Sequence, residues 1–200
     1  MELVLALAMF CAATLFTPGP NNLMLMTSGL NYGFRRSLPH FWGVNLGFAL
    51  MVLLVGLGLG QVFAIYPALY LALKYIGAAY LLFLAWEIAS AGPVAAGAAG
   101  RGRPLTFLEA AAFQWINPKA WVMAVGAVSA YAAIAPFPWN MALIAAMFGT
   151  LGVASCGTWV GFGTALQRLL TDPRHVRVFN VAMALMLAAS LLPILADLWK

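Results

Sequence analysis

Charged residues are scarce in this sequence of 200 residues: they make up 8% of it, whereas hydrophobic residues make up 64%. The mean hydropathy is +0.95. A water-soluble domain is about half apolar and about a quarter charged, so this composition excludes a surface that faces water throughout. The net charge of +5 comes from too few side chains to form a nucleic-acid-binding face. We therefore expect a protein embedded in a lipid bilayer.

Cysteine and histidine are also rare, with two residues of each. Cys11 and Cys156 lie in apolar stretches, which suits small packing residues better than a disulfide framework. No metal site and no cofactor are expected, because soft divalent cations bind to clustered thiolates and imidazoles. The GxxxxGK[ST] motif of nucleotide-binding loops is missing from the sequence, which excludes ATP as the energy source on this chain.

Long apolar runs fill most of the sequence. A helix needs about 20 mainly apolar residues to cross a membrane. The segments that meet this length are residues 3–27, 38–61, 67–89, 106–132, 139–166 and 176–197. The first of them lacks the positive leader of a signal peptide, so we interpret it as a retained membrane helix. Residues 90–105 are rich in Gly, Ala and Pro, as is typical of a flexible linker.

Arginine is concentrated in the first, third and fifth connections between these segments. The residues are Arg35, Arg36, Arg101, Arg103, Arg168, Arg174 and Arg177. The other side of the membrane carries only Lys200. Because cytoplasmic loops carry the excess of Lys and Arg, the pattern predicts cytoplasmic basic loops and both termini outside.

The two halves of the chain share a pattern. Helices 1 and 4 are each interrupted by proline, and the following helix in each half is rich in glycine at spacings near four, which lets helix backbones approach closely in lipid. Three spans in each half require the second half to insert upside down. The sequence thus predicts an all-α, single-domain membrane protein of six transmembrane helices, arranged as two inverted three-helix repeats over residues 1–89 and 106–200.

The first interruption reads FTPGPNN, residues 16–22. Pro18 and Pro20 each remove a backbone donor and free a carbonyl one turn earlier, so we expect the helix to open near residues 17–21. Backbone exposed in this way must be buried in protein or line a polar cavity. A half-helix N-terminus suits a carboxylate, and freed carbonyls suit an ammonium. A simple packing kink remains the alternative.

Lys119 follows Pro118 near the middle of the fourth segment. A lysine at the centre of a membrane helix costs about 2.5 to 3.5 kcal/mol on insertion scales, and Glu109 is about 15 Å away along the axis. We interpret this cation as a site for a substrate carboxylate. A structural clamp, in which the lysine binds freed carbonyls of helix 1, remains open and is compatible with that role.

The remaining candidates are neutral or lie nearer the membrane surface. The expected substrate-binding residues are Thr17, Gly19, Asn21, Asn22, Asn117 and Lys119. His40 and Glu109 lie toward the inner mouth, where either is a candidate carrier of a coupling proton. The alternatives are hydrogen bonding between helices for the amides and ordinary interfacial residues for His40 and Glu109.

Three stretches together resemble a known family. TPGPNNLMLMTSGLNYGFRRSLPHFWGVNLGF, KYIGAAYLLFLAW and FQWINPKAW are similar to signatures of the lysine-exporter (LysE/RhtB) family of bacterial amino-acid exporters. The resemblance covers nearly the whole chain. It implies a multi-pass bacterial inner-membrane protein that exports amino acids or close derivatives by antiport with protons. Glu87 and Ala110 depart from the family pattern, where a basic residue and a glycine are common.

The sequence therefore predicts a secondary exporter, not an enzyme, of neutral amino acids or their derivatives, because no acid lies at midplane depth to hold a second cation. Its expected partners are the amino acid, protons and the bilayer; a homo-oligomer is left open. The alternatives within the same superfamily are a metal-ion exporter and a membrane thiol-redox protein. Both are disfavoured by the small number of Cys and His residues and by their positions.

Overall fold

The computed structural model describes residues 1–59, 65–90, 103–170 and 172–192. All regular secondary structure within these residues is helical, in agreement with the predicted class. The α-helices are α1 (Glu2–Phe16), α2 (Pro20–Arg36), α3 (Leu38–Leu54), α5 (Pro67–Ser90), α6 (Phe107–Phe113), α7 (Pro118–Tyr131), α8 (Trp139–Leu169) and α9 (Pro173–Ala189). Short π or 3-10 turns extend three of them, as η1 (Val55–Leu59), η2 (Gln114–Ile116) and η3 (Ala132–Ile134).

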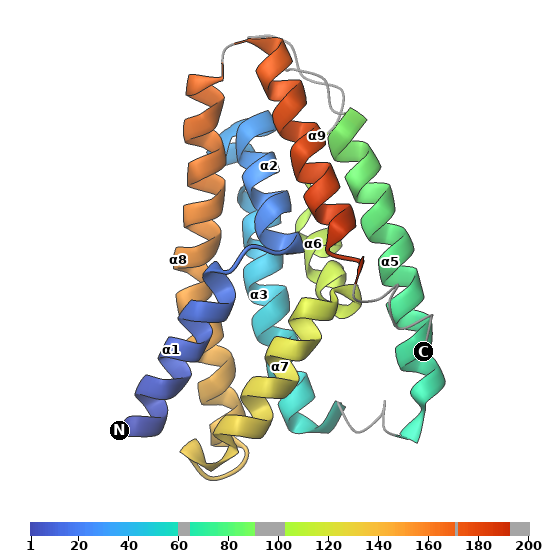
Figure 1. The fold of residues 1–200 in the computed structure, drawn as a ribbon. Helices are drawn as coiled ribbons and strands as arrows, with labels where there is room; N and C mark the ends of the chain where they lie inside the picture. The colour runs from blue at the N-terminus through green and yellow to red at the C-terminus, as the bar shows by residue number, and fades with distance from the viewer. Residues whose placement is uncertain (60–64, 91–102, 171, 193–200) are drawn as a thin grey trace.

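The helices lie lengthwise in one bundle (Figure 1). Leu38–Leu59 and Trp139–Leu169 are long and apolar enough to span a membrane, as is the pair α1 and α2 when its two members are taken as one span bent by 55°. Two shorter apolar helices are Tyr75–Ser90 and Pro118–Ile134. Six spans in two inverted repeats therefore remain a prediction. Most of the linker and the end of the sixth predicted segment lie outside the described residues.

Both predicted interruptions are present. α1 ends at Phe16 and α2 begins at Pro20, and between them Thr17 and Gly19 have extended backbones. The fourth predicted segment is broken at Asn117, which is also extended. In Figure 1, α1 rises from the N-terminus to its break and α2 continues upward, whereas α7 runs downward from the second break. The half-helices α2 and α7 thus start near the middle of the bundle and run in opposite directions.

One boundary differs from the prediction. The first segment was expected to end near residue 27, with Arg35 and Arg36 in a loop, but α2 continues to Arg36. Its polar second half is held by neighbours: Asn31 is buried and exchanges two hydrogen bonds of 3.1 Å with Asn180 of α9. This pairing supports the helix beyond residue 27, whereas Gly33, with φ 76° and ψ 169°, breaks the helical backbone just before Arg35 and Arg36.

Close backbone packing fixes the relative positions of the helices. A side chain at Gly29 of α2 or at Gly163 of α8 would overlap the backbone of the other helix. Gly43 and Gly47 of α3 fit in the same way against α6. Small residues at these positions allow the backbones to approach, as is usual between membrane helices. By contrast, open space surrounds Gly161, so not every glycine of the predicted stripes is a packing contact.

The ends of the bundle differ in charge. α2, α5 and α8 end, and α9 begins, at the upper end in Figure 1. The described arginines of these helix ends are Arg35, Arg36, Arg168, Arg174 and Arg177. We call this the basic end of the bundle; the N-terminus lies at the opposite end. Arg101 and Lys200 lie outside the described residues.

Candidate functional site at the two helix breaks

The break between α1 and α2 frees backbone carbonyls. In a continuous helix, the carbonyls of residues 14–17 would accept from the N–H groups of residues 18–21. Pro18 and Pro20 have no N–H, and the extended backbone carries the other donors away. The carbonyls of Leu15 and Thr17 therefore need partners from elsewhere in the protein.

Side chains from three helices supply those partners. The Asn22 Nδ2 donates to the Leu15 oxygen at 2.7 Å and to the Thr17 oxygen at 2.9 Å. The Ser155 hydroxyl of α8 also donates to the Leu15 oxygen, at 2.8 Å. The Thr17 hydroxyl, in contrast, bonds locally to the Ala13 carbonyl. Thr17 thus contributes its carbonyl to the site, and its side chain does not line the cavity found there.

The second break is built around Asn117, which ends η2 and caps α7. Its side-chain oxygen accepts from the Lys119 N–H at 3.1 Å, and Pro118 occupies the first position of α7, where no donor is needed. The Trp121 indole donates to the Trp115 carbonyl at 2.8 Å. These contacts hold the start of α7 and orient Lys119 toward the first break.

The two breaks are joined directly. The Lys119 ammonium donates to the Thr17 carbonyl at 2.6 Å. Asn21 and Gln114 exchange two amide hydrogen bonds, of 2.8 and 3.1 Å. The structural clamp considered for Lys119 is therefore present in this conformation. Gly19 makes room for it, because a Cβ there would lie 2.8 Å from the Lys119 Cδ.

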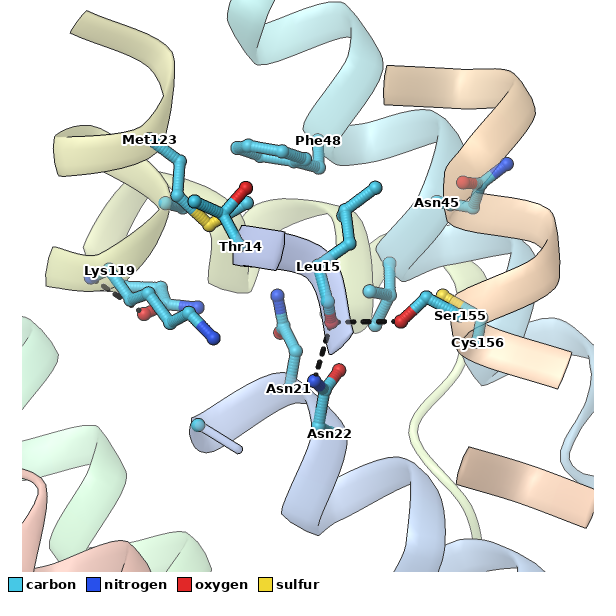
Figure 2. A pocket seen from close by; sticks show the side chains of 15 residues that line it. Thr14, Leu15, Asn21, Asn22, Asn45, Phe48, Lys119, Met123, Ser155 and Cys156 are labelled. Atoms are coloured by element: carbon cyan, nitrogen blue, oxygen red, sulfur yellow. Dashed lines mark hydrogen bonds between the residues drawn. The ribbon is translucent and has the colours of Figure 1, made fainter. Parts of the chain in front are cut away.

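A small cavity lies where the breaks meet, and Figure 2 shows its lining. Its volume is about 40 Å³, which is room for about three water molecules. The polar residues around it are Thr14, Asn21, Asn22, Asn45, Asn117, Lys119 and Ser155. Five of the six predicted substrate-binding residues line it, with Thr17 the exception, and we call it the break cavity. Phe48, Met123 and Cys156 complete an apolar side.

The charged side chain in the lining of the break cavity is positive. Among the described residues, its lining contains the Lys119 ammonium and no carboxylate. The N-termini of α2 and α7 both start at it, and the N-terminus of a helix carries about half a positive charge. The arrangement attracts an anionic group, while the carbonyls of Leu15 and Thr17 each already accept two hydrogen bonds in this conformation.

Ser155, Cys156 and Phe48 were not predicted as site residues. A serine and a cysteine in an apolar helix carry no signal of their own, and only the packing of α8 on α1 brings them to the break. Asn45 and Gln114 are amide side chains within predicted membrane helices, and this polarity is the sequence signal that points to them.

His40 and Glu109 do not belong to the break cavity. They line a second, larger cavity toward the basic end, with a volume of about 340 Å³. Its other polar residues are Thr27, Ser28, Asn31, Tyr32, Tyr80, Glu87 and Arg103. We call it the basic-end cavity. Its walls come from α2, α3, α5 and the start of α6.

The two proton-carrier candidates differ in environment. His40 is buried, and its Nδ1 lies 2.8 Å from the Ser28 hydroxyl, while its Nε2 has no hydrogen-bond partner among the described residues. Glu109 forms two 2.6 Å hydrogen bonds with the Arg103 guanidinium and a capping box with Thr106. The hydrogen bonds and the charge of Glu109 raise the pKa of Arg103, which therefore stays cationic.

The cysteines give no sign of acting together. Cys11 and Cys156 are free thiols in separate apolar clusters. Across the described residues, no three His, Cys, Asp or Glu side chains gather closely enough to hold a metal ion.

Comparison with known proteins identifies the family. The family model "LysE type translocator" matches residues 12–196. The chain is 33% identical over 181 residues to proteins named cysteine/O-acetylserine efflux protein from Escherichia coli K12 and Shigella sonnei, covering 87% of this chain and 88% of each relative. No solved structure matches it. On these matches, the chain belongs to the LysE family of translocators, the family that its first-helix and fourth-helix motifs resemble.

Proposed function

We propose that this protein is a secondary exporter of a neutral amino acid or an O-acylated amino-acid derivative across the bacterial inner membrane. The observation that carries the proposal is the break cavity, which holds one ammonium and two helix N-termini and has no carboxylate in its lining. The relatives named for efflux of cysteine and O-acetylserine support a small, uncharged cargo side chain.

The two ends of a zwitterion have distinct partners at the breaks. The cargo carboxylate replaces the Thr17 carbonyl as the partner of Lys119, because two opposite full charges attract each other more strongly than an ammonium attracts a neutral carbonyl. The cargo ammonium binds the released Thr17 carbonyl and nearby amide oxygens of Asn21, Asn22 or Asn117. A second cationic group would face Lys119 without a carboxylate to balance it, which disfavours basic amino acids.

The conformation described here is closed around the break cavity. A volume of about 40 Å³ is far below the 300 Å³ or more of ordinary small-molecule pockets, so the helices must move apart for cargo to bind. We propose six spans in two inverted repeats, with the basic end cytoplasmic and both termini outside. The opposite directions of α2 and α7 support this arrangement.

We further propose that export is coupled to inward proton movement. His40 is the better placed of the two candidates, because it is buried and has one ring nitrogen without a partner among the described residues. Glu109 is already engaged by Arg103 and Thr106. Replacing His40 with Gln should then remove the dependence of efflux on an imposed pH gradient.

Efflux measurements test the proposal. Vesicles containing the protein are loaded with single amino acids, including cysteine, O-acetylserine and lysine, and release is followed with and without a pH gradient. We expect release of small neutral cargo and none of lysine, faster when the gradient is imposed. Release of no amino acid, or of lysine above all others, contradicts the proposed function.

A further inference from the structure

We propose that the basic-end cavity is a second binding site, at which a zwitterionic amino acid binds before it reaches the breaks. Arg103 is the partner of its carboxylate and Glu87 the partner of its ammonium. The identity of the ligand rests on the proposed function. The existence of the site rests on the size, charges and position of the cavity.

The two cavities differ in volume. The basic-end cavity, at about 340 Å³, is more than eight times the volume of the break cavity, at about 40 Å³. It falls within the usual range of about 300 to 1,000 Å³ for small-molecule pockets. In this conformation it alone, among the two, has room for an amino acid.

The charges of the basic-end cavity match a zwitterion. Glu87 is exposed and has no hydrogen-bond or ion-pair partner in the part of the chain that the structure describes. The Arg103–Glu109 pair is bidentate, but 60% and 36% of its side chains are accessible, so water screens it and a ligand in the cavity can reach the guanidinium. A cargo carboxylate can therefore replace Glu109 as the hydrogen-bond partner of Arg103, while Glu87 binds the cargo ammonium.

The inner wall offers a further hydrogen bond. His40 is 1% exposed, lines the cavity, and has an unpartnered Nε2 within the described residues. Its other ring nitrogen is held by Ser28 at 2.8 Å, so the ring is fixed in place. A buried polar atom without a partner is costly, so Nε2 is a candidate partner for the ligand once the surrounding side chains move to expose it.

The position of the basic-end cavity determines which of the two sites a cargo molecule meets first. Along α2, Asn21 and Asn22 line the break cavity, whereas Met24, Thr27 and Ser28 line the basic-end cavity. The Asn21–Gln114 amide pair lies at the boundary. Cargo arriving from the basic end therefore meets the larger cavity first and passes this pair to reach Lys119.

Equilibrium binding to the purified chain in detergent tests the inference, with O-acetyl-L-serine and L-cysteine as probes. We expect Glu87→Gln and Arg103→Gln each to raise Kd about tenfold, the loss expected for one charge-assisted contact. Glu87→Asp and Arg103→Lys should retain most of the affinity, because they keep the charges.

The matched controls are Glu2→Gln and Arg168→Gln, which remove charges that do not line the cavity. They should leave Kd unchanged. Unchanged Kd in Glu87→Gln and Arg103→Gln, or an equal rise of Kd in the two control variants, overturns the second site. These results are distinct from failure of the proposed function, which is absence of amino-acid efflux by the unaltered chain.

Discussion

The break cavity and the basic-end cavity share α2 and α3 as walls but differ in volume and in charge. The first is small, is bordered by two helix N-termini, and carries one positive charge that is already bound to a carbonyl. The second is large and carries charges of both signs on exposed side chains. Under the two proposals above, the first contact with the cargo and its passage across the bilayer take place at different depths of one bundle.

The largest effect is expected from Lys119→Ala, which removes the only charge from the lining of the break cavity. Efflux should fall to the background of vesicles without the protein, because neither the Thr17 carbonyl nor a cargo carboxylate keeps its cationic partner. The amount of protein in the membrane should be normal and is measured alongside. Efflux at the unaltered rate would show that the contrast in charge between the cavities has no functional meaning.

A smaller loss is expected when the first break is repaired by Pro18→Ala with Pro20→Ala. The missing donors are restored, so α1 and α2 can join and the carbonyls of Leu15 and Thr17 return to the helix. We expect maximal efflux to fall roughly tenfold, which corresponds to about 1.4 kcal/mol in the barrier. Unchanged efflux kinetics would mean that the break is a packing kink without a role in transport.

The boundary between the cavities is tested through Cys156, a native thiol in the break cavity. In a Cys11→Ser background, Gln114→Ala removes the amide pair with Asn21 and should speed labelling of Cys156 by a small thiol reagent several-fold. Gln167→Ala, which changes an exposed glutamine of α8, is the matched control. Equal labelling rates in all three proteins would mean that the pair does not separate the cavities.

The smallest effect is expected from Ser155→Ala. The Leu15 carbonyl loses one of two donors but keeps Asn22, so the stability should drop by about 1 kcal/mol or less. Asn22→Ala should cost more, because it removes a donor from both Leu15 and Thr17. Thermal unfolding in detergent compares the two, and the reverse order would contradict the hydrogen bonding described for the break.

The sequence predicted both breaks because proline acts locally: a missing N–H ends a helix whatever surrounds it. It also indicated that Lys119 needs a partner, since an isolated charge in a membrane helix is costly. It did not predict that α2 continues past residue 27, because the helix there is held by the Asn31–Asn180 pair across the bundle, and its backbone is broken only at Gly33. The basic-end cavity was equally out of reach, since its shape comes from how α5 and the start of α6 pack against α2 and α3.

The positions of the close-packed glycines constrain how such a protein can move. Gly29 and Gly163 allow close contact between α2 and α8, and Gly43 and Gly47 allow close contact between α3 and α6. Each contact joins a helix of the first half of the chain to a helix of the second half. If the two halves of the chain moved as separate rigid bodies, both of these close helix–helix contacts would have to break. The bodies that shift during a transport cycle are therefore expected to be mixed pairs drawn from both halves, with the flexible joints at residues 17–19 and 117 between them.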